Sequence, residues 1–104
     1  MKVFDIADDQ GRVFAFEVVN FGRHRVAKFL ERTPGVKVIR KQKHFAATSE
    51  AVFCEFEFRG QRFLVEEPWN DSSRYWIGTD PPEWCSQLEA VRAAFAQHKA
   101  WWLL

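Results

Sequence analysis

The side chains with the greatest capacity for chemistry gather between residues 66 and 78, where the chain reads EEPWNDSSRYWIG. The stretch holds three carboxylates, one arginine, the only tyrosine and two tryptophans. Loops usually consist of small polar residues and turn formers. Large aromatic side chains among charges therefore favour either a recognition surface or a loop pinned onto the core. The candidate partner-binding or ligand-binding residues are Glu67, Trp69, Asn70, Asp71, Arg74, Tyr75 and Trp76.

The paired carboxylates of this stretch do not form an acid/base pair. Glu66 and Glu67 are adjacent at the end of a predicted strand, and neighbouring strand residues point to opposite faces. We expect Glu67 to project toward the core face, where a carboxylate needs a partner. Arg74 is the expected partner, so that the two clamp the loop, and a ligand-binding role for Glu67 is the alternative.

The remaining nucleophiles and metal ligands lack a catalytic pattern. Cys54 alternates with Phe56 and Phe58, which predicts a buried and inert thiol. Cys85 falls in the first turn of a predicted helix, where the helix dipole lowers a thiol pKa, but packing beside Trp84 is favoured. The three histidines have no Cys, His or carboxylate at ligand spacing, and no glycine-rich phosphate loop is present. We predict no catalytic residue, no metal and no cofactor, and hence a protein that is not an enzyme.

Positive charge is concentrated in one segment. Between Arg23 and His44 there are eight basic residues and one acid, whereas the whole chain has a net charge of +1. Such a surface can bind phosphates, and the candidate nucleic-acid residues are Arg23, Arg25, Lys28, Arg40, Lys41 and Lys43. No RNA-binding signature accompanies them, and Phe29 is predicted to be buried. A solvated basic face, or one paired with Glu55, Glu57 and Glu66, is favoured.

The composition is that of a globular domain. At 104 residues, 47% hydrophobic and 16% aromatic, the chain can build a core without disulfides or a metal, and we expect one domain over residues 1–104. A charged fraction of 28% excludes a disordered or membrane composition. Acidic residues interrupt the N-terminal region and no apolar run is long enough for a membrane span, so we expect a cytoplasmic protein.

Periodicity predicts the first four elements. Residues 2–7 and 12–19 alternate as a β-hairpin, with Phe4 and Ile6 on the same aromatic face as Phe14, Phe16 and Val18. Asn20 can cap a helix over residues 21–32, whose buried stripe is Val26, Phe29 and Leu30. A strand over residues 36–41 follows.

The second half predicts three strands and a long helix. Residues 52–59 and the strand that begins at Arg62 form a hairpin around a Gly60-Gln61 turn, which sets Phe58 opposite Phe63 and places Glu55 beside Glu66. Residues 74–79 form a short strand. Asp80 then caps a helix that begins at Pro81 and carries Trp84 on its buried stripe.

The expected fold is α+β: a two-layer sandwich of a mainly antiparallel sheet, in the order β-β-α-β-β-β-β-α, with two helices packed on one face. The predicted core consists of Phe14, Phe16, Val26, Phe29, Leu30, Phe56, Phe58, Phe63, Val65, Leu88, Val91 and Phe95.

The sequence favours a small intracellular interaction module that recognises a protein or a small ligand through residues 66–78. An electrostatic nucleic-acid-binding protein using residues 23–44 is the alternative. The apolar tail Trp101–Leu104 either docks on its own domain or joins two copies as a homodimer.

Overall fold

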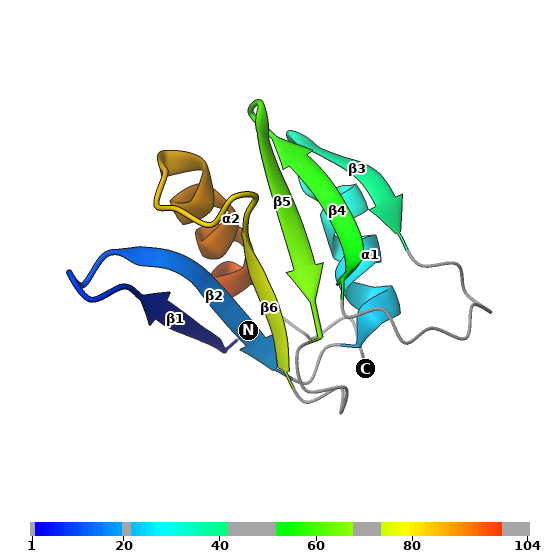
Figure 1. The fold of residues 1–104 in the computed structure, drawn as a ribbon. Coiled ribbons are helices and arrows are strands. Elements are labelled where there is room, and N and C mark those ends of the chain that lie inside the picture. Colours follow the sequence, from blue (N-terminus) through cyan, green and yellow to red (C-terminus); the bar gives the residue numbers. More distant parts are fainter. Residues whose placement is uncertain (1, 20–21, 42–51, 68–73, 99–104) are drawn as a thin grey trace.

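The computed structural model describes residues 2–19, 22–41, 52–67 and 74–98. The described elements are β1 (Val3–Ala7), β2 (Val13–Val19), α1 (Arg23–Arg32), β3 (Val36–Lys41), β4 (Val52–Phe58), β5 (Gln61–Glu66), β6 (Arg74–Thr79) and α2 (Ser86–Gln97). The strands form one antiparallel sheet in the order β1-β2-β6-β5-β4-β3. Both helices lie behind the same face of this sheet (Figure 1). The predicted two-layer α+β sandwich and its element order are therefore confirmed.

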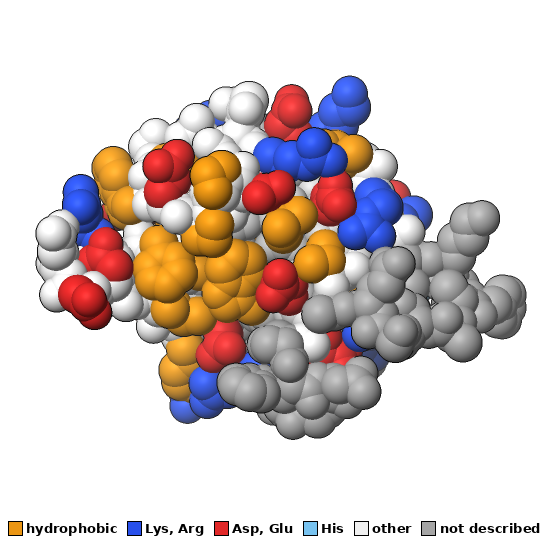
Figure 2. Space-filling model, in the orientation of Figure 1, with side chains coloured by type: hydrophobic (Ala, Val, Ile, Leu, Met, Phe, Trp, Pro, Cys, Tyr) orange, Lys and Arg blue, Asp and Glu red, His pale blue; other side chains and the backbone are white. Residues whose placement is uncertain are grey.

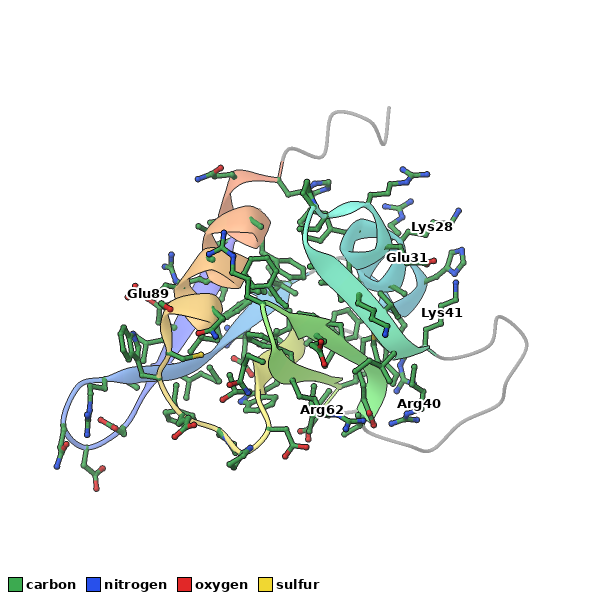
Figure 3. All side chains as sticks on the ribbon, turned by 90° about the horizontal axis from the view of Figure 1, so that it is seen from above. Lys28, Glu31, Arg40, Lys41, Arg62 and Glu89 are labelled. Carbon is green, nitrogen blue, oxygen red and sulfur yellow. The ribbon has the colours of Figure 1, made fainter. Side chains whose placement is uncertain are left out.

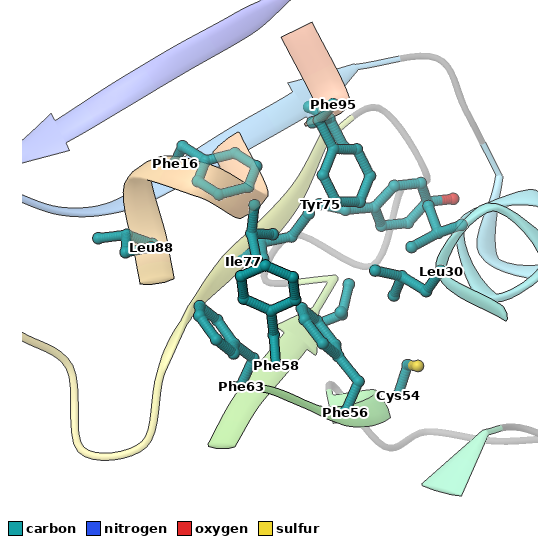
Figure 4. Close-up of a cluster of buried hydrophobic side chains, with 14 of the residues drawn as sticks. Phe16, Leu30, Cys54, Phe56, Phe58, Phe63, Tyr75, Ile77, Leu88 and Phe95 are labelled. Atoms are coloured by element: carbon teal, nitrogen blue, oxygen red, sulfur yellow. The ribbon is translucent and has the colours of Figure 1, made fainter. Parts of the chain in front are cut away.

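The core lies between the sheet and the two helices (Figure 4). Its centre is aromatic: the rings of Phe56 and Phe63 stack at 4.8 Å between centroids, and Phe16 meets Phe95 at 5.6 Å. All the predicted core residues are buried except Phe14 and Phe29, which are half-buried. We call this side of the sheet the helix face.

The β4–β5 hairpin turns one residue earlier than predicted. Arg59 and Gly60 both have positive φ, 50° and 81°, as a type I′ two-residue turn requires. Phe58 therefore pairs with Gln61, and Phe56 pairs with Phe63. The predicted register was wrong by two residues, and because strand side chains alternate with a period of two, each residue keeps its predicted face.

This register also removes the expected repulsion between like charges. Glu57 lies opposite Arg62, and Glu55 lies opposite Leu64 instead of Glu66. Opposite charges across the strands stabilise a sheet, whereas like charges destabilise it.

The predicted aromatic face of the first hairpin was wrong for β1. Phe4 pairs with Glu17, so it lies on the side of the sheet away from the helices, while Val3 pairs with Val18 and packs against the core. The prediction failed because pairing shifted by one residue exchanges the two faces of a strand. Asp5 thereby faces α2 and forms an ion pair with the Arg92 guanidinium, which holds the helix against this edge.

Both helices begin later than predicted. Gly22 is the N-cap of α1 and provides no side-chain cap, and Asn20 lies outside the described residues. Cys85 is the N-cap of α2, and its Sγ accepts a hydrogen bond from the backbone N–H of Leu88 at 3.4 Å. The thiol therefore occupies the capping position instead of the first helical turn.

A hydrogen-bonded loop occupies the place of the predicted first turn of α2. The buried Thr79 hydroxyl accepts a hydrogen bond from the Glu83 backbone N–H at 2.8 Å and donates to the Pro81 carbonyl oxygen. These bonds hold residues 81–83 outside the helix. Trp84 consequently precedes the helix and is 48% exposed, instead of lying on its buried stripe.

Candidate interaction surface

The sheet face opposite the helices is covered by no described helix or strand, and we call it the open face. Cross-strand pairing arranges its side chains in two rows. One row is Phe4, Glu17, Trp76, Glu66 and Val52; the other is Ile6, Ala15, Gly78, Leu64, Glu55 and Arg40. Figure 2 shows hydrophobic side chains gathered at the centre of this face with charged groups around them.

Trp76 and Gly78 form the centre of the open face. A Cβ atom at Gly78 would lie only 2.5 and 2.7 Å from two carbons of the Trp76 six-membered ring and 3.1 Å from the Cβ of Ala15. The indole therefore lies across the bare backbone of Gly78, because only glycine leaves the space for it. The half-buried ring presents a broad apolar surface on a strand that the sheet holds in place.

An ion pair borders Trp76 on the β1–β2 side. The Arg74 Nη1 atom lies 3.0 Å from Oε1 of Glu17, and the guanidinium carbon lies 4.6 Å from the centroid of the Phe4 ring. The guanidinium therefore makes a cation–π contact as well as an ion pair. Arg74 is exposed but held in one orientation by two neighbours.

A second ionic group borders the face on the β3–β4 side. The Glu55 carboxylate lies 2.6 Å from Arg62 and 3.0 Å from Arg40, so one acid bridges two guanidinium groups. The hydrogen bond from Arg62 is the largest cause that lowers the pKa of Glu55, and the bond from Arg40 adds to it. This border is therefore charged throughout the neutral pH range.

The open face is chemically mixed. The charged residues that strand pairing places on it are balanced, with the acids Glu17, Glu55, Glu57 and Glu66 and the bases Lys37, Arg40, Arg62 and Arg74. An antiparallel sheet with one solvated face usually carries polar residues there. Here the residues at the centre are apolar and aromatic. This arrangement suits a partner with its own apolar patch and charges of both signs.

Strand alternation separates two of the predicted site residues. Tyr75 is fully buried on the helix face, where its ring meets Phe53 edge-on at 5.3 Å. Trp76 lies on the open face, so these two neighbours in the chain have opposite environments. Trp69, Asn70 and Asp71 lie outside the described residues.

The predicted partner of Glu67 was wrong. Glu67 is only 5% exposed, and its Oε1 atom lies 2.6 Å from Nε of Arg23 at the start of α1. The Arg23 guanidinium also lies 4.8 Å from the centroid of the Phe53 ring. Arg74 cannot take this role because it points to the open face, whereas Glu67 projects to the helix face beyond Val65. Glu67 therefore connects α1 to the end of β5.

The candidate nucleic-acid residues are divided among different partners. Arg23 binds Glu67, Arg40 binds Glu55, and Lys41 Nζ lies 3.0 Å from Glu31 on α1. Figure 3 shows Lys41 near Glu31, while Arg40 and Arg62 lie apart from them. Arg25 and Lys28 remain exposed on α1, and Lys43 lies outside the described residues, as does the Trp101–Leu104 tail. The expected pairing of the basic segment with acids is confirmed for Arg40 and Glu55.

Burial shifts the pKa of two other reactive side chains in the described part of the chain. Cys54 is fully buried, and burial raises the pKa of its thiol to about 12. Burial also lowers the pKa of His98, whose ring packs against Phe29 at 4.7 Å. Within residues 2–19, 22–41, 52–67 and 74–98, no group of three or more His, Cys, Asp or Glu residues could hold a metal ion.

Sequence reasoning missed Phe4, Ile6 and Leu64 as members of this surface. Phe4 and Ile6 were assigned to the core face because a one-residue shift in hairpin pairing cannot be detected from alternation alone. Leu64 alternates with the charged Arg62 and Glu66, and this pattern is the signal that could have identified it as the apolar centre of an otherwise polar strand face.

None of the helices in the described segments is long and apolar enough to cross a membrane. Comparison with known proteins adds no identity: no family model, no curated protein and no solved structure matches this chain.

Proposed function

We propose that this protein is a non-enzymatic interaction module whose open face binds a partner protein. Trp76 and Arg74, which belong to the 66–78 segment, are the anchors, and Phe4, Ile6 and Leu64 enlarge the contact surface. The observation that carries this proposal is the apolar centre of a sheet face that no described element covers, with Trp76 lying across Gly78.

Residue types support a protein as the partner. Trp and Arg dominate the binding energy of protein interfaces when an apolar centre is surrounded by polar residues. The side chains of Trp76 and Arg74 already have defined neighbours in Gly78, Glu17 and Phe4, so little side-chain entropy remains to be lost on binding. The balanced charge argues against a polyanion on this face, because phosphate binding requires an excess of Lys and Arg.

Site-specific photocrosslinking tests the proposal. A photoreactive phenylalanine analogue replaces Leu64 on the open face or, as the control, the exposed Glu89 on α2. Both proteins are irradiated in extracts of the source cells, and the products are identified by mass spectrometry. We expect one partner to be captured from position 64 and not from position 89, and Trp76→Ala to abolish its capture.

The opposite result is equally clear. If position 64 captures nothing above the background of position 89, or if Trp76→Ala leaves the captured partner unchanged, the open face is not a recognition surface. Folding of each variant is checked by thermal unfolding, so that loss of capture is not mistaken for loss of structure.

A further inference from the structure

A second surface lies on the other layer of the molecule. A groove of about 580 Å³ runs along α1 and reaches Ala94 and His98 at the end of α2. Its lining residues are His24, Arg25, Lys28, Phe29, Arg32, Thr33, Pro34, Ala94 and His98. A volume of this size falls in the range of ligand-binding clefts, roughly 300–1,000 Å³.

The interior of the groove is apolar. The half-buried Phe29 of α1 packs against Phe95 at 4.6 Å and against His98 at 4.7 Å, so its ring is fixed by two neighbours at the end of α2. Ala94 and Pro34 extend this apolar lining. One or two apolar side chains of a ligand can therefore be buried against Phe29 and Ala94.

The rim of the groove is cationic. Arg25, Lys28 and Arg32 recur at helical spacing along one side of α1, a line about 10 Å long at 1.5 Å per residue. None of the described residues that line the groove is acidic. Glu31, the acid of α1, binds Lys41 and is not part of this lining. Figure 3 shows Lys28 on the outer side of α1.

The apolar interior and the cationic rim indicate which kind of ligand the groove can bind. Three cations along about 10 Å match a row of carboxylates better than a single small anion. The apolar interior requires aliphatic or aromatic side chains beside those carboxylates. A nucleic acid fits less well, because its bases need an open ring to stack on and the Phe29 ring is engaged by Phe95 and His98.

We propose that this α1–α2 groove binds an acidic amphipathic segment of a partner protein. Apolar side chains of the segment lie on Phe29 and Ala94, and its carboxylates meet Arg25, Lys28 and Arg32. This is the helix-in-groove mode of recognition. The groove is separate from the open face, and this proposal does not depend on the function proposed for that face.

Fluorescence anisotropy with a designed peptide tests this proposal. The probe is a fluorescein-labelled peptide of about 14 residues with leucine at i, i+3, i+4 and i+7 spacing and glutamate elsewhere. A matched peptide with lysine in place of every glutamate is the control. We expect the full chain to bind the acidic peptide, the affinity to fall as salt is added, and the lysine peptide not to bind.

Two variants and one control variant locate the site. Lys28→Glu combined with Arg32→Glu should weaken binding by about tenfold or more, since two attractive rim charges become repulsive. Lys2→Glu combined with Lys37→Glu changes the net charge equally at exposed positions outside the groove and should change affinity less than about twofold. Ala94→Phe fills the apolar interior and should abolish binding without altering any charge.

Several results would overturn the proposal. Absence of peptide binding, or equal weakening by the two double variants, would show that the groove is not the site. Tighter binding of a labelled single-stranded oligonucleotide through Lys28 and Arg32 would assign it to nucleic acid instead. Self-association that the same charge reversal abolishes, without peptide binding, would assign it to a second copy of the chain.

Discussion

The two faces of the sheet use the same strands for different purposes. On the helix face, Phe16, Phe56 and Phe63 are fully buried against each other and the helices. On the open face, Trp76 and Leu64 are half-buried, and ion pairs surround them. The difference shows that aromatic content by itself does not mark a binding site in this chain. The face on which a strand places a side chain decides whether that side chain stabilises the fold or remains available to a partner.

The largest expected effect comes from the helix face. Phe56→Ala should lower the free energy of unfolding by about 3–5 kcal/mol, because it removes a fully buried ring and leaves a cavity. Leu64→Ala on the same hairpin should cost about 1 kcal/mol, because Leu64 is half-buried on the open face. Urea denaturation measures both values. Equal losses would remove the distinction between the faces.

The buried ion pair should rank next. Glu67→Ala removes this carboxylate from the Arg23 guanidinium, and the Arg23 side chain is only 18% exposed. We therefore expect the free energy of unfolding to fall by about 2–3 kcal/mol. Arg74→Ala breaks an exposed pair on the open face and should cost less than about 1 kcal/mol. A larger loss for Arg74→Ala in the same urea experiment would contradict this ranking.

Gly78→Ala tests whether the Trp76 ring lies across Gly78 on the open face. The added Cβ would collide with the Trp76 ring, so we expect a loss of about 1–3 kcal/mol and a displaced indole N–H signal of Trp76 in the NMR spectrum. The double variant Gly78→Ala with Trp76→Ala should recover part of this loss, because no ring remains to collide. Independent, additive effects would show that the two positions do not interact.

The pH dependence of Glu55 should be the smallest effect. Because its pKa lies below the ordinary value of 4.5, its stabilising contribution is fully present above pH 4.5 and is lost as the pH falls through the lowered value. Glu55→Gln should therefore destabilise by about 0.5–1 kcal/mol at pH 7, and its stability should approach that of the unchanged protein near pH 3. Urea midpoints of both proteins between pH 3 and pH 7 measure this difference in stability. A difference that does not change with pH would show that ionisation of Glu55 is not its cause.

The sequence predicted the architecture because its main signals are local. Alternation located the strands, and the stripe of Val26, Phe29 and Leu30 located α1. The α2 start was wrong because the bonds made by Thr79 depend on where β6 ends in space, and these bonds override the capping signal at Asp80.

The candidate site was predictable only in part. The alternation of Arg74, Tyr75 and Trp76 indicated that Tyr75 and Trp76 face opposite ways, but not which of the two is buried. The partner of Glu67 could not be predicted, because Arg23 is 44 residues away in the sequence. The two side chains meet only once α1 packs against the sheet. The α1–α2 groove could not be predicted either, because it depends on how two helices distant in sequence approach each other.

Tyr75 and Trp76 offer the most direct test, because they are neighbours in the chain and lie on opposite faces. Thermal unfolding and photocrosslinking from position 64 are measured for Tyr75→Ala and Trp76→Ala. We predict that Tyr75→Ala costs about 3–5 kcal/mol. Trp76→Ala should cost about 1 kcal/mol, a shift of about 4–8 °C for a domain of this size, and should abolish capture of the partner. Two results together would contradict the central claim: Trp76→Ala destabilises the protein as much as Tyr75→Ala, and position 64 captures no partner even when Trp76 and Tyr75 are both present. Trp76 would then serve only the fold.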